Sequence, residues 1–162
     1  MGYSGSNGLS TVLPNCGGSF GVHSPDTSQS LVQHSQITLS SAQILAMYVT
    51  PVQLIPAPAT GLSIVVDRWR LRMIASATAY ASGGAVNIQY GNTGSGGGTA
   101  LGGTAAAALV TTATPGTVDS QISLGASTQT LTQASGVFIT NATGAFTTGT
   151  GTAVIDIWFA IN

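Results

Sequence analysis

The sequence predicts an all-β fold, an antiparallel β-sandwich with one short helix. Short apolar or alternating segments recur along the chain, glycine and proline separate them, and a single stretch carries the start signal of a helix. The 162 residues suffice for one domain with a real core, and no shift of composition after residue 40 indicates a second domain. We therefore expect a single sandwich domain over residues 31–162, preceded by an extended arm.

Residues 1–30 are predicted to form this extended N-terminal arm. They are rich in serine, threonine and glycine, contain Pro14 and Pro25, and show no helical or strand periodicity for more than a few residues. Such a segment cannot bury enough apolar area to order itself. Four of its apolar residues are available to pack on a neighbouring molecule: Val12, Leu13, Phe20 and Val22. We expect a partner to order the arm, and the alternative is an unattached tail.

The domain itself is predicted to begin with a strand and the single helix. Residues 31–39 fit a strand. Ser40, with Gln43 three positions later, makes a capping-box pattern, which predicts a short helix through Met47. Since Pro51 cannot continue a helix, the helix ends before it.

Residues 50–69 combine three prolines and one glycine with two short apolar runs, which predicts a strand, a corner and a second strand. Pro51 can open the first strand because a first position need not donate to the ladder, and the next two prolines end its pairing. Gly61 then turns the chain into residues 62–66.

The longest predicted strand covers residues 65–75. Its alternation puts Asp67, Trp69, Leu71 and Met73 on one face and Val66, Arg68, Arg70, Arg72 and Ile74 on the other. Further strands are predicted at residues 86–90, 118–124, 136–140 and 153–161, the last with Ile155, Ile157, Phe159 and Ile161 on one face. Residues 91–104 are so rich in glycine that we expect a mobile loop or tip there instead of a strand.

The charge of the chain is very low. Three Arg and four Asp are its only formally charged side chains, whereas an average soluble domain is about 25% charged. Because charge keeps monomers dispersed and protects sheet edges, a permanently assembled state is expected. The net charge of −1 offers nothing to attract free nucleic acid, and no apolar run approaches the roughly 20 residues of a membrane helix. The first residues lack the pattern of a signal peptide, so we expect synthesis in the cytosol.

Catalytic and metal-binding side chains are sparse. Four Asp, two His and one Cys are spread over unrelated segments, and Cys16 has no second cysteine with which to form a disulfide. A pair of Cys16 with His23 or His34 would involve the weakly structured arm, where preorganisation would be poor. We therefore expect no enzyme, no cofactor and no metal site within one chain, although a trimer axis would gather three copies of one His.

All of the cationic residues, Arg68, Arg70 and Arg72, have a spacing that aligns them along one strand face. Two readings stay open. In the first, which we favour, they pair with Asp67, Asp119 or Asp156 of the same assembly, because a sheet face close to the core satisfies its own charges. In the second, their planar guanidinium groups bind acidic groups of another subunit or of a larger shell.

Three segments resemble a group of tailed-phage structural proteins. The first is Thr-Pro-x-x-Leu-x-Pro-Ala-Pro at 50–58, followed by glycine and Ile-Val-Val. The second combines Thr-Ala-Tyr at 78–80, two glycines and Val-Asn-Ile-Gln-Tyr at 86–90. The third is Thr-Gly-Thr-Gly-Thr-Ala-Val-Ile-Asp-Ile-Trp-Phe at 148–159. Together they extend the resemblance over residues 40–162.

This resemblance implies a jelly-roll-like β-sandwich that decorates or cements a phage head as a homotrimer. The partner so implied is the major capsid protein, and the location is the capsid surface of a virion made in the host cytoplasm. The alternative is a tail-associated adhesin or fibre head domain that binds a host glycan. Its features would be a glycine-rich tip and an aromatic platform drawn from Tyr3, Tyr48, Tyr80, Tyr90, Trp69 and Trp158.

Overall fold

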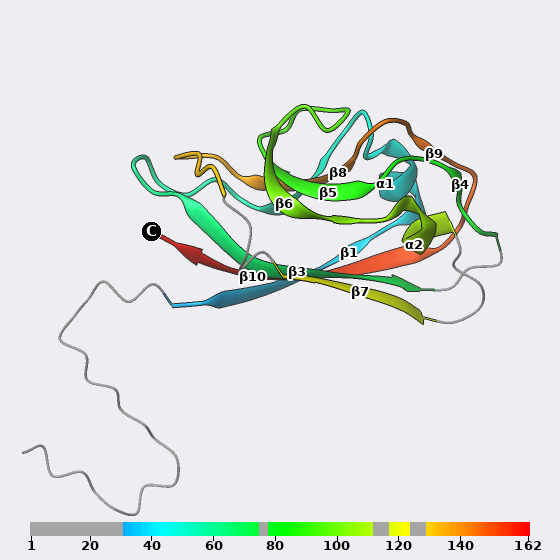
Figure 1. Ribbon diagram of the computed structural model, residues 1–162, viewed down its shortest axis with the longest axis horizontal. Helices are drawn as coiled ribbons and strands as arrows, with labels where there is room; N and C mark the ends of the chain where they lie inside the picture. The colour runs from blue at the N-terminus through cyan, green and yellow to red at the C-terminus, as the bar shows by residue number, and fades with distance from the viewer. Residues whose placement is uncertain (1–30, 75–77, 112–116, 124–128) are drawn as a thin grey trace, which may run out of the picture.

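The computed structural model describes residues 31–74, 78–111, 117–123 and 129–162, with residues 117–123 placed by their backbone alone. The predicted arm lies outside these ranges, and with it Val12, Leu13, Phe20, Val22, Cys16 and His23. The described chain forms a two-layer antiparallel sandwich, which confirms the predicted fold class (Figure 1).

Each layer is a four-stranded sheet. Sheet A has the order β1-β10-β3-β7, with β1 at Gln33–Leu39, β10 at Thr152–Ile161, β3 at Ile64–Ile74 and β7 at Thr117–Ser123. Sheet B has the order β2-β8-β5-β6, with β2 at Val52–Ile55, β8 at Val137–Asn141, β5 at Val86–Tyr90 and β6 at Thr99–Ala105. A small ribbon of β4 (Ala81–Ser82) and β9 (Phe146–Thr147) closes one end, together with the helices α1 (Ser41–Ala46) and α2 (Ala107–Thr111).

The topology is that of a jelly roll. If the eight sandwich strands are counted along the chain, the first pairs with the last, the second with the seventh, the third with the sixth and the fourth with the fifth. This nested antiparallel pairing is what results when one long hairpin rolls up into two sheets. Strands that pair are therefore far apart in sequence, and the sheet faces combine residues from both halves of the domain.

The core lies between the two sheets. Apolar side chains from the inner faces of both sheets are almost completely buried there, including Trp69, Leu71, Ile88, Ile139 and Ile155. Burial of each large side chain of this kind stabilises the fold by about 1.5–3 kcal/mol relative to an exposed position. The period-2 pattern in the sequence correctly identified most of these inward positions.

Local signals fix the start of α1 and the corner that precedes β3. The Ser40 hydroxyl accepts a hydrogen bond from the Gln43 backbone N–H, while the Gln43 side chain accepts one from the Ser40 N–H, so the predicted capping box is present. Gly61 has a φ of +88°, a left-handed conformation that glycine adopts without strain. The predicted strands at 62–66 and 65–75 form one continuous strand, β3.

Strand β3 contains an irregularity that the strict alternation did not predict. Across the β10 pairing, Trp158 lies opposite Arg68 and Phe159 opposite Val66, so Asp67 is an extra, bulged residue. Val66 is consequently buried on the same side as Trp69, and Asp67 is exposed. The prediction that Val66 shares a face with the arginines and Asp67 a face with Trp69 is therefore wrong.

The glycine-rich segment also differs from expectation. Its second part is strand β6, because Leu101 fills the core with 0% exposure and backbone pairing with β5 holds the strand in place. Gly102 and Gly103 have φ values of +86° and +67°, and they accommodate the register shift against β5. Helix α2 follows directly, so the described chain has two short helices where the sequence predicted one.

Candidate functional site

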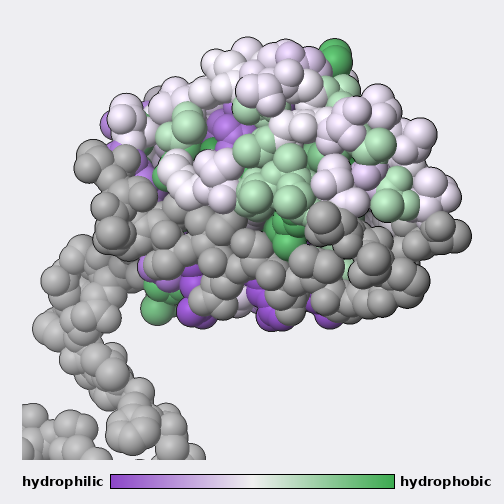
Figure 2. All heavy atoms as spheres, turned by 45° about the vertical axis from the view of Figure 1, so that its right-hand side comes forward, coloured by the Kyte–Doolittle hydropathy of each residue, from purple (hydrophilic) through white to green (hydrophobic). Residues whose placement is uncertain are grey.

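The outer face of sheet A combines side chains from three neighbouring strands. Because β10 lies between β1 and β3, outward residues in register form three cross-strand rows: His34–Trp158–Arg68, Gln36–Asp156–Arg70 and Thr38–Val154–Arg72. The alternation of residues 68–73 leaves all three arginines outside and Trp69 inside, and the bulge at Asp67 returns Val66 to the inner side. We call this surface the three-row face. In Figure 2 the hydrophilic colour gathers along the lower side, where Figure 1 has sheet A.

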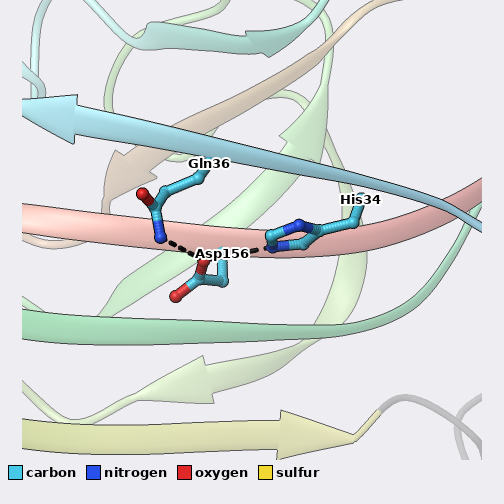
Figure 3. Close-up of polar contacts among 3 residues, drawn as sticks. All are labelled: His34, Gln36 and Asp156. Atoms are coloured by element: carbon cyan, nitrogen blue, oxygen red, sulfur yellow. Dashed lines mark hydrogen bonds and ion pairs between the residues drawn. The ribbon is translucent and has the colours of Figure 1, made fainter.

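Asp156 is the centre of the middle row. Its Oδ1 accepts a hydrogen bond from Gln36 Nε2 at 2.8 Å and lies 3.1 Å from His34 Nε2, so two residues of β1 converge on one carboxylate of β10 (Figure 3). Burial acts to raise the pKa of Asp156, but the two hydrogen bonds and the charges of His34 and Arg70 outweigh it and lower the pKa below its ordinary value. Asp156 is therefore an ionised carboxylate held in place at neutral pH.

Trp158 is flanked in the first row by one residue from each neighbouring strand. The His34 ring stacks on it with centroids 4.7 Å apart and planes inclined by 28°. The Arg68 guanidinium carbon lies 4.3 Å from the centre of the indole, a cation–π distance. These contacts hold the imidazole and the guanidinium in defined positions against the indole.

The three arginines are half-buried on this face. The Nε atoms of Arg68 and Arg72 are buried and have no hydrogen-bond partner among the described residues. Arg72 lies opposite Asp119 of β7 in the backbone register, and Arg70 contributes to the low pKa of Asp156. The charge of Arg70 thus favours the ionised form of Asp156, one of the three predicted aspartate partners.

Two of the predicted aspartate partners are accounted for and one is not. Asp156 belongs to the three-row face, whereas Asp67 is exposed on the bulge. Asp119 is placed by its backbone only.

The sequence did not predict that His34, Gln36 and Trp158 belong to the three-row face. The outward positions of β10 follow from its alternation, but the pairing with β1 joins residues 122 positions apart and leaves no local signal.

The middle of the outer face of sheet B is covered by a loop instead. Gln89 has 0% exposure although it points away from the core, because residues 91–98 fold back over it. Its amide nitrogen donates to the backbone oxygens of Gly91 at 3.0 Å and Thr93 at 2.7 Å, and its oxygen accepts from the Gly98 N–H at 3.2 Å. The loop is anchored a second time where the Ser95 N–H donates to the carbonyl oxygen of Tyr48. It is therefore a packed cover of sheet B and not an open tip.

The aromatic platform of the adhesin alternative does not form from three of its predicted members. Trp69, Tyr80 and Tyr90 have exposures of 0–3% and belong to the core. The Tyr80 hydroxyl donates to the carbonyl oxygen of Gly151, and that of Tyr90 donates to the carbonyl oxygen of Ile64. Burial raises the pKa of Tyr80 to about 12 and also raises that of Tyr90. Tyr3 lies outside the described residues.

Over the described ranges, no group of three or more His, Cys, Asp or Glu side chains gathers as a candidate metal site. Within the same ranges, neither helix has the length and apolar character needed to cross a membrane.

Comparison with known proteins gives little. No protein-family model and no curated protein matches the sequence. Among solved structures, the chain is similar to one in the "Cyanophage Pam1 capsid asymmetric unit", with a TM-score of 0.43 and 13% sequence identity over 82% of this chain and 84% of that chain. At this TM-score the likeness is weak.

Proposed function

We propose that this protein is a non-enzymatic structural subunit of a tailed-phage virion that assembles as a homotrimer and binds the head shell through the three-row face. The observation that carries the proposal is the charge distribution. All Arg residues of the chain lie on one sheet face, and the other outer sheet face is neutral and partly covered by its own loop. In a chain with 4% charged residues, such a concentration favours a partner with acidic groups at this face.

Two further arguments support the virion assignment. The segments at 50–58, 78–90 and 148–159 resemble tailed-phage decoration proteins, and the jelly-roll fold agrees with the sandwich that this resemblance implies. Jelly rolls also occur in lectins and cupins, so the fold by itself is an analogy. The burial of Trp69, Tyr80 and Tyr90 favours shell binding over the glycan-binding alternative.

We propose that the protein acts by binding to the head shell and stabilising it. A trimer presents three copies of the three-row face and engages several shell subunits at once, so weak contacts add up by multivalency. A protein that binds only the intact shell stabilises that shell by mass action. No bond is made or broken in the process, and the partner is the major capsid protein.

Single Arg→Gln substitutions test this proposal, because glutamine keeps much of the side-chain stem and removes the cation and its fork of donors. We expect Arg72→Gln to weaken cosedimentation with undecorated heads about tenfold, and to reduce the dependence of binding on salt, with little change in thermal stability. Arg70→Gln should lower the stability of the isolated protein, because its charge favours ionised Asp156.

Gln53→Ala provides the control, because Gln53 is an exposed residue of sheet B and its substitution by alanine removes no charge. Binding of the Arg72→Gln protein that equals the control at every salt concentration would remove the three-row face from the shell interface. If all the proteins bind glycan arrays and none binds heads, the adhesin alternative replaces the proposal.

A further inference from the structure

Exposed apolar residues collect at one end of the sandwich. Leu31 and Val32, just before β1, are 78% and 64% exposed, and Leu62 and Leu131 are 40% and 47% exposed. We call these four residues the apolar end.

Backbone pairing places the apolar end around the last residues of β10. The β1–β10 register puts Gln33 opposite Phe159, so Leu31 continues toward the C-terminal residues, and the start of β1 and the C terminus lie at the same end in Figure 1. Ser63, next to Leu62, exchanges two backbone hydrogen bonds with Asn162 and bridges to Gln133, which is near Leu131.

Strand β1, which begins beside the apolar end, is an unprotected edge. Within the described residues it pairs only with β10, so its other side offers backbone N–H and C=O groups. Its sequence, Gln-His-Ser-Gln-Ile-Thr-Leu, contains no proline, lysine or carboxylate, the residues that commonly block edge pairing. An extended segment can add to such an edge as a further strand.

The occupant we infer is the N-terminal segment of a second copy of this chain. Thirty residues precede Leu31 and include Val12, Leu13, Phe20 and Val22. Fully extended they span about 100 Å, well beyond the roughly 30 Å diameter of a domain of this size. The seven residues directly before Leu31, Ser-Pro-Asp-Thr-Ser-Gln-Ser, are polar apart from one proline and suit a connection between subunits.

We propose that residues 1–30 of one copy add a strand to the β1 edge of the next copy, and that their apolar side chains cover its apolar end. A head-to-tail exchange of this kind forms a ring when the rotation between successive copies closes, and a trimer is such a ring. The inference rests on the homotrimer of the proposed function but does not require that the protein belongs to a virion. It is therefore tested on the isolated protein, and a failure to bind phage heads would not affect the result.

Cysteine trapping in the full-length protein tests the exchange directly. The natural Cys16 lies in the N-terminal segment, so Gln33, Ser35 or Thr38 of β1 is replaced singly by cysteine and the protein is oxidised mildly. We expect at least one variant to form covalent oligomers, with a Cys16 disulfide to β1 that mass spectrometry of mixed isotope-labelled copies assigns to two different chains. Val49→Cys, at an exposed apolar residue between α1 and β2, should form no disulfide to Cys16.

Three results would overturn the proposal. Disulfides within one chain would show that the segment pairs with its own β1, and oligomers that persist after Cys16→Ser would show that two β1 edges pair directly. Absence of any disulfide to Cys16 would mean that the segment does not reach the edge.

A variant with lysines at the apolar end provides a second test that needs no cysteine chemistry. Leu31→Lys with Val32→Lys should weaken self-association at least about tenfold in analytical ultracentrifugation, because two exposed aliphatic side chains lose their apolar contacts. Val49→Lys with Ile74→Lys is the matched control, since it also adds two lysines at exposed apolar residues, 73% and 37% exposed, that lie outside the apolar end. Equal association of both proteins would contradict the proposed cover of the apolar end.

Discussion

The two outer faces of this sandwich satisfy their polar groups in different ways. On sheet A, side chains of neighbouring strands interact with one another: His34 and Gln36 contact Asp156, and the charge of Arg70 lowers its pKa. On sheet B, the chain backbone itself covers the face, and Gln89 bonds to the loop that folds over it. One face therefore presents charged groups to the surroundings, whereas on the other the loop buries Gln89 in the middle and leaves Gln53 at the side exposed.

This difference shows how a chain with so few charges can still form a specific surface. Neutral polar residues such as Gln89, Thr140 and Asn141 make internal hydrogen bonds, whereas the arginines share one face with an ionised aspartate. A half-buried guanidinium held by neighbours loses less conformational entropy on binding than a free one. The concentration of charge on sheet A thus follows from where the fold places these residues. We therefore expect mutations on the two faces to have different effects.

The largest effect is expected on the covered face. Gln89→Ala removes the amide that satisfies two backbone carbonyls and one N–H of the loop, and should lower the free energy of unfolding by about 2–4 kcal/mol. Chemical denaturation measures this loss. Gln53→Ala, at an exposed position of the same sheet, should change stability by less than about 0.5 kcal/mol. Equal behaviour of the two variants would mean that the loop does not depend on Gln89.

A second test addresses how closely the loop packs. A Cβ added at Gly98 would lie 2.4 Å from the Tyr90 carbonyl oxygen and 2.7 Å from the Gln89 side chain. Gly98→Ala should therefore cost about 2 kcal/mol of stability through overpacking. At Gly144 a Cβ meets nothing within 4 Å, so Gly144→Ala is the matched control and should melt close to the wild-type temperature. A stable Gly98→Ala protein would indicate that the cover is loosely attached.

The smallest effect concerns the open face and depends on pH. The folded pKa of Asp156 is lowered, so its ionisation stabilises the protein above the unfolded pKa of about 3.9 and this contribution is lost as pH falls through the folded value. We expect Asp156→Asn to cost about 1–2 kcal/mol at neutral pH and progressively less below about pH 4. Urea unfolding at several pH values measures the difference.

Asp67→Asn is the control for this pH dependence, because Asp67 is an exposed aspartate of the adjacent strand. Its unfolding free energy should follow that of the wild-type protein across the same pH range. A constant deficit of the Asp156→Asn protein at all pH values would contradict the role of the ionised carboxylate.

Interactions between residues close in sequence made much of the fold predictable. The Ser40–Gln43 capping box starts α1, Gly61 makes the turn before β3, and the alternation at 86–90 matches β5. Each depends on a few neighbouring residues, whose backbone preferences and side-chain periods act before any tertiary contact forms. The same reasoning identified the arginine spacing as the main candidate site.

Tertiary structure decided what depends on pairing between distant strands. The period-2 rule failed at Asp67 because a bulge is defined by the partner strand, β10, and local propensity failed at β6 because burial of Leu101 and pairing with β5 outweigh the entropy cost of its glycines. By itself the sequence determined an antiparallel sandwich, its capped helix and the spacing of its cations. Only the rolled-up topology brought β1 beside β10 and so placed His34 and Gln36 on Asp156, because hydrogen bonds between strands join residues without regard to their distance along the chain.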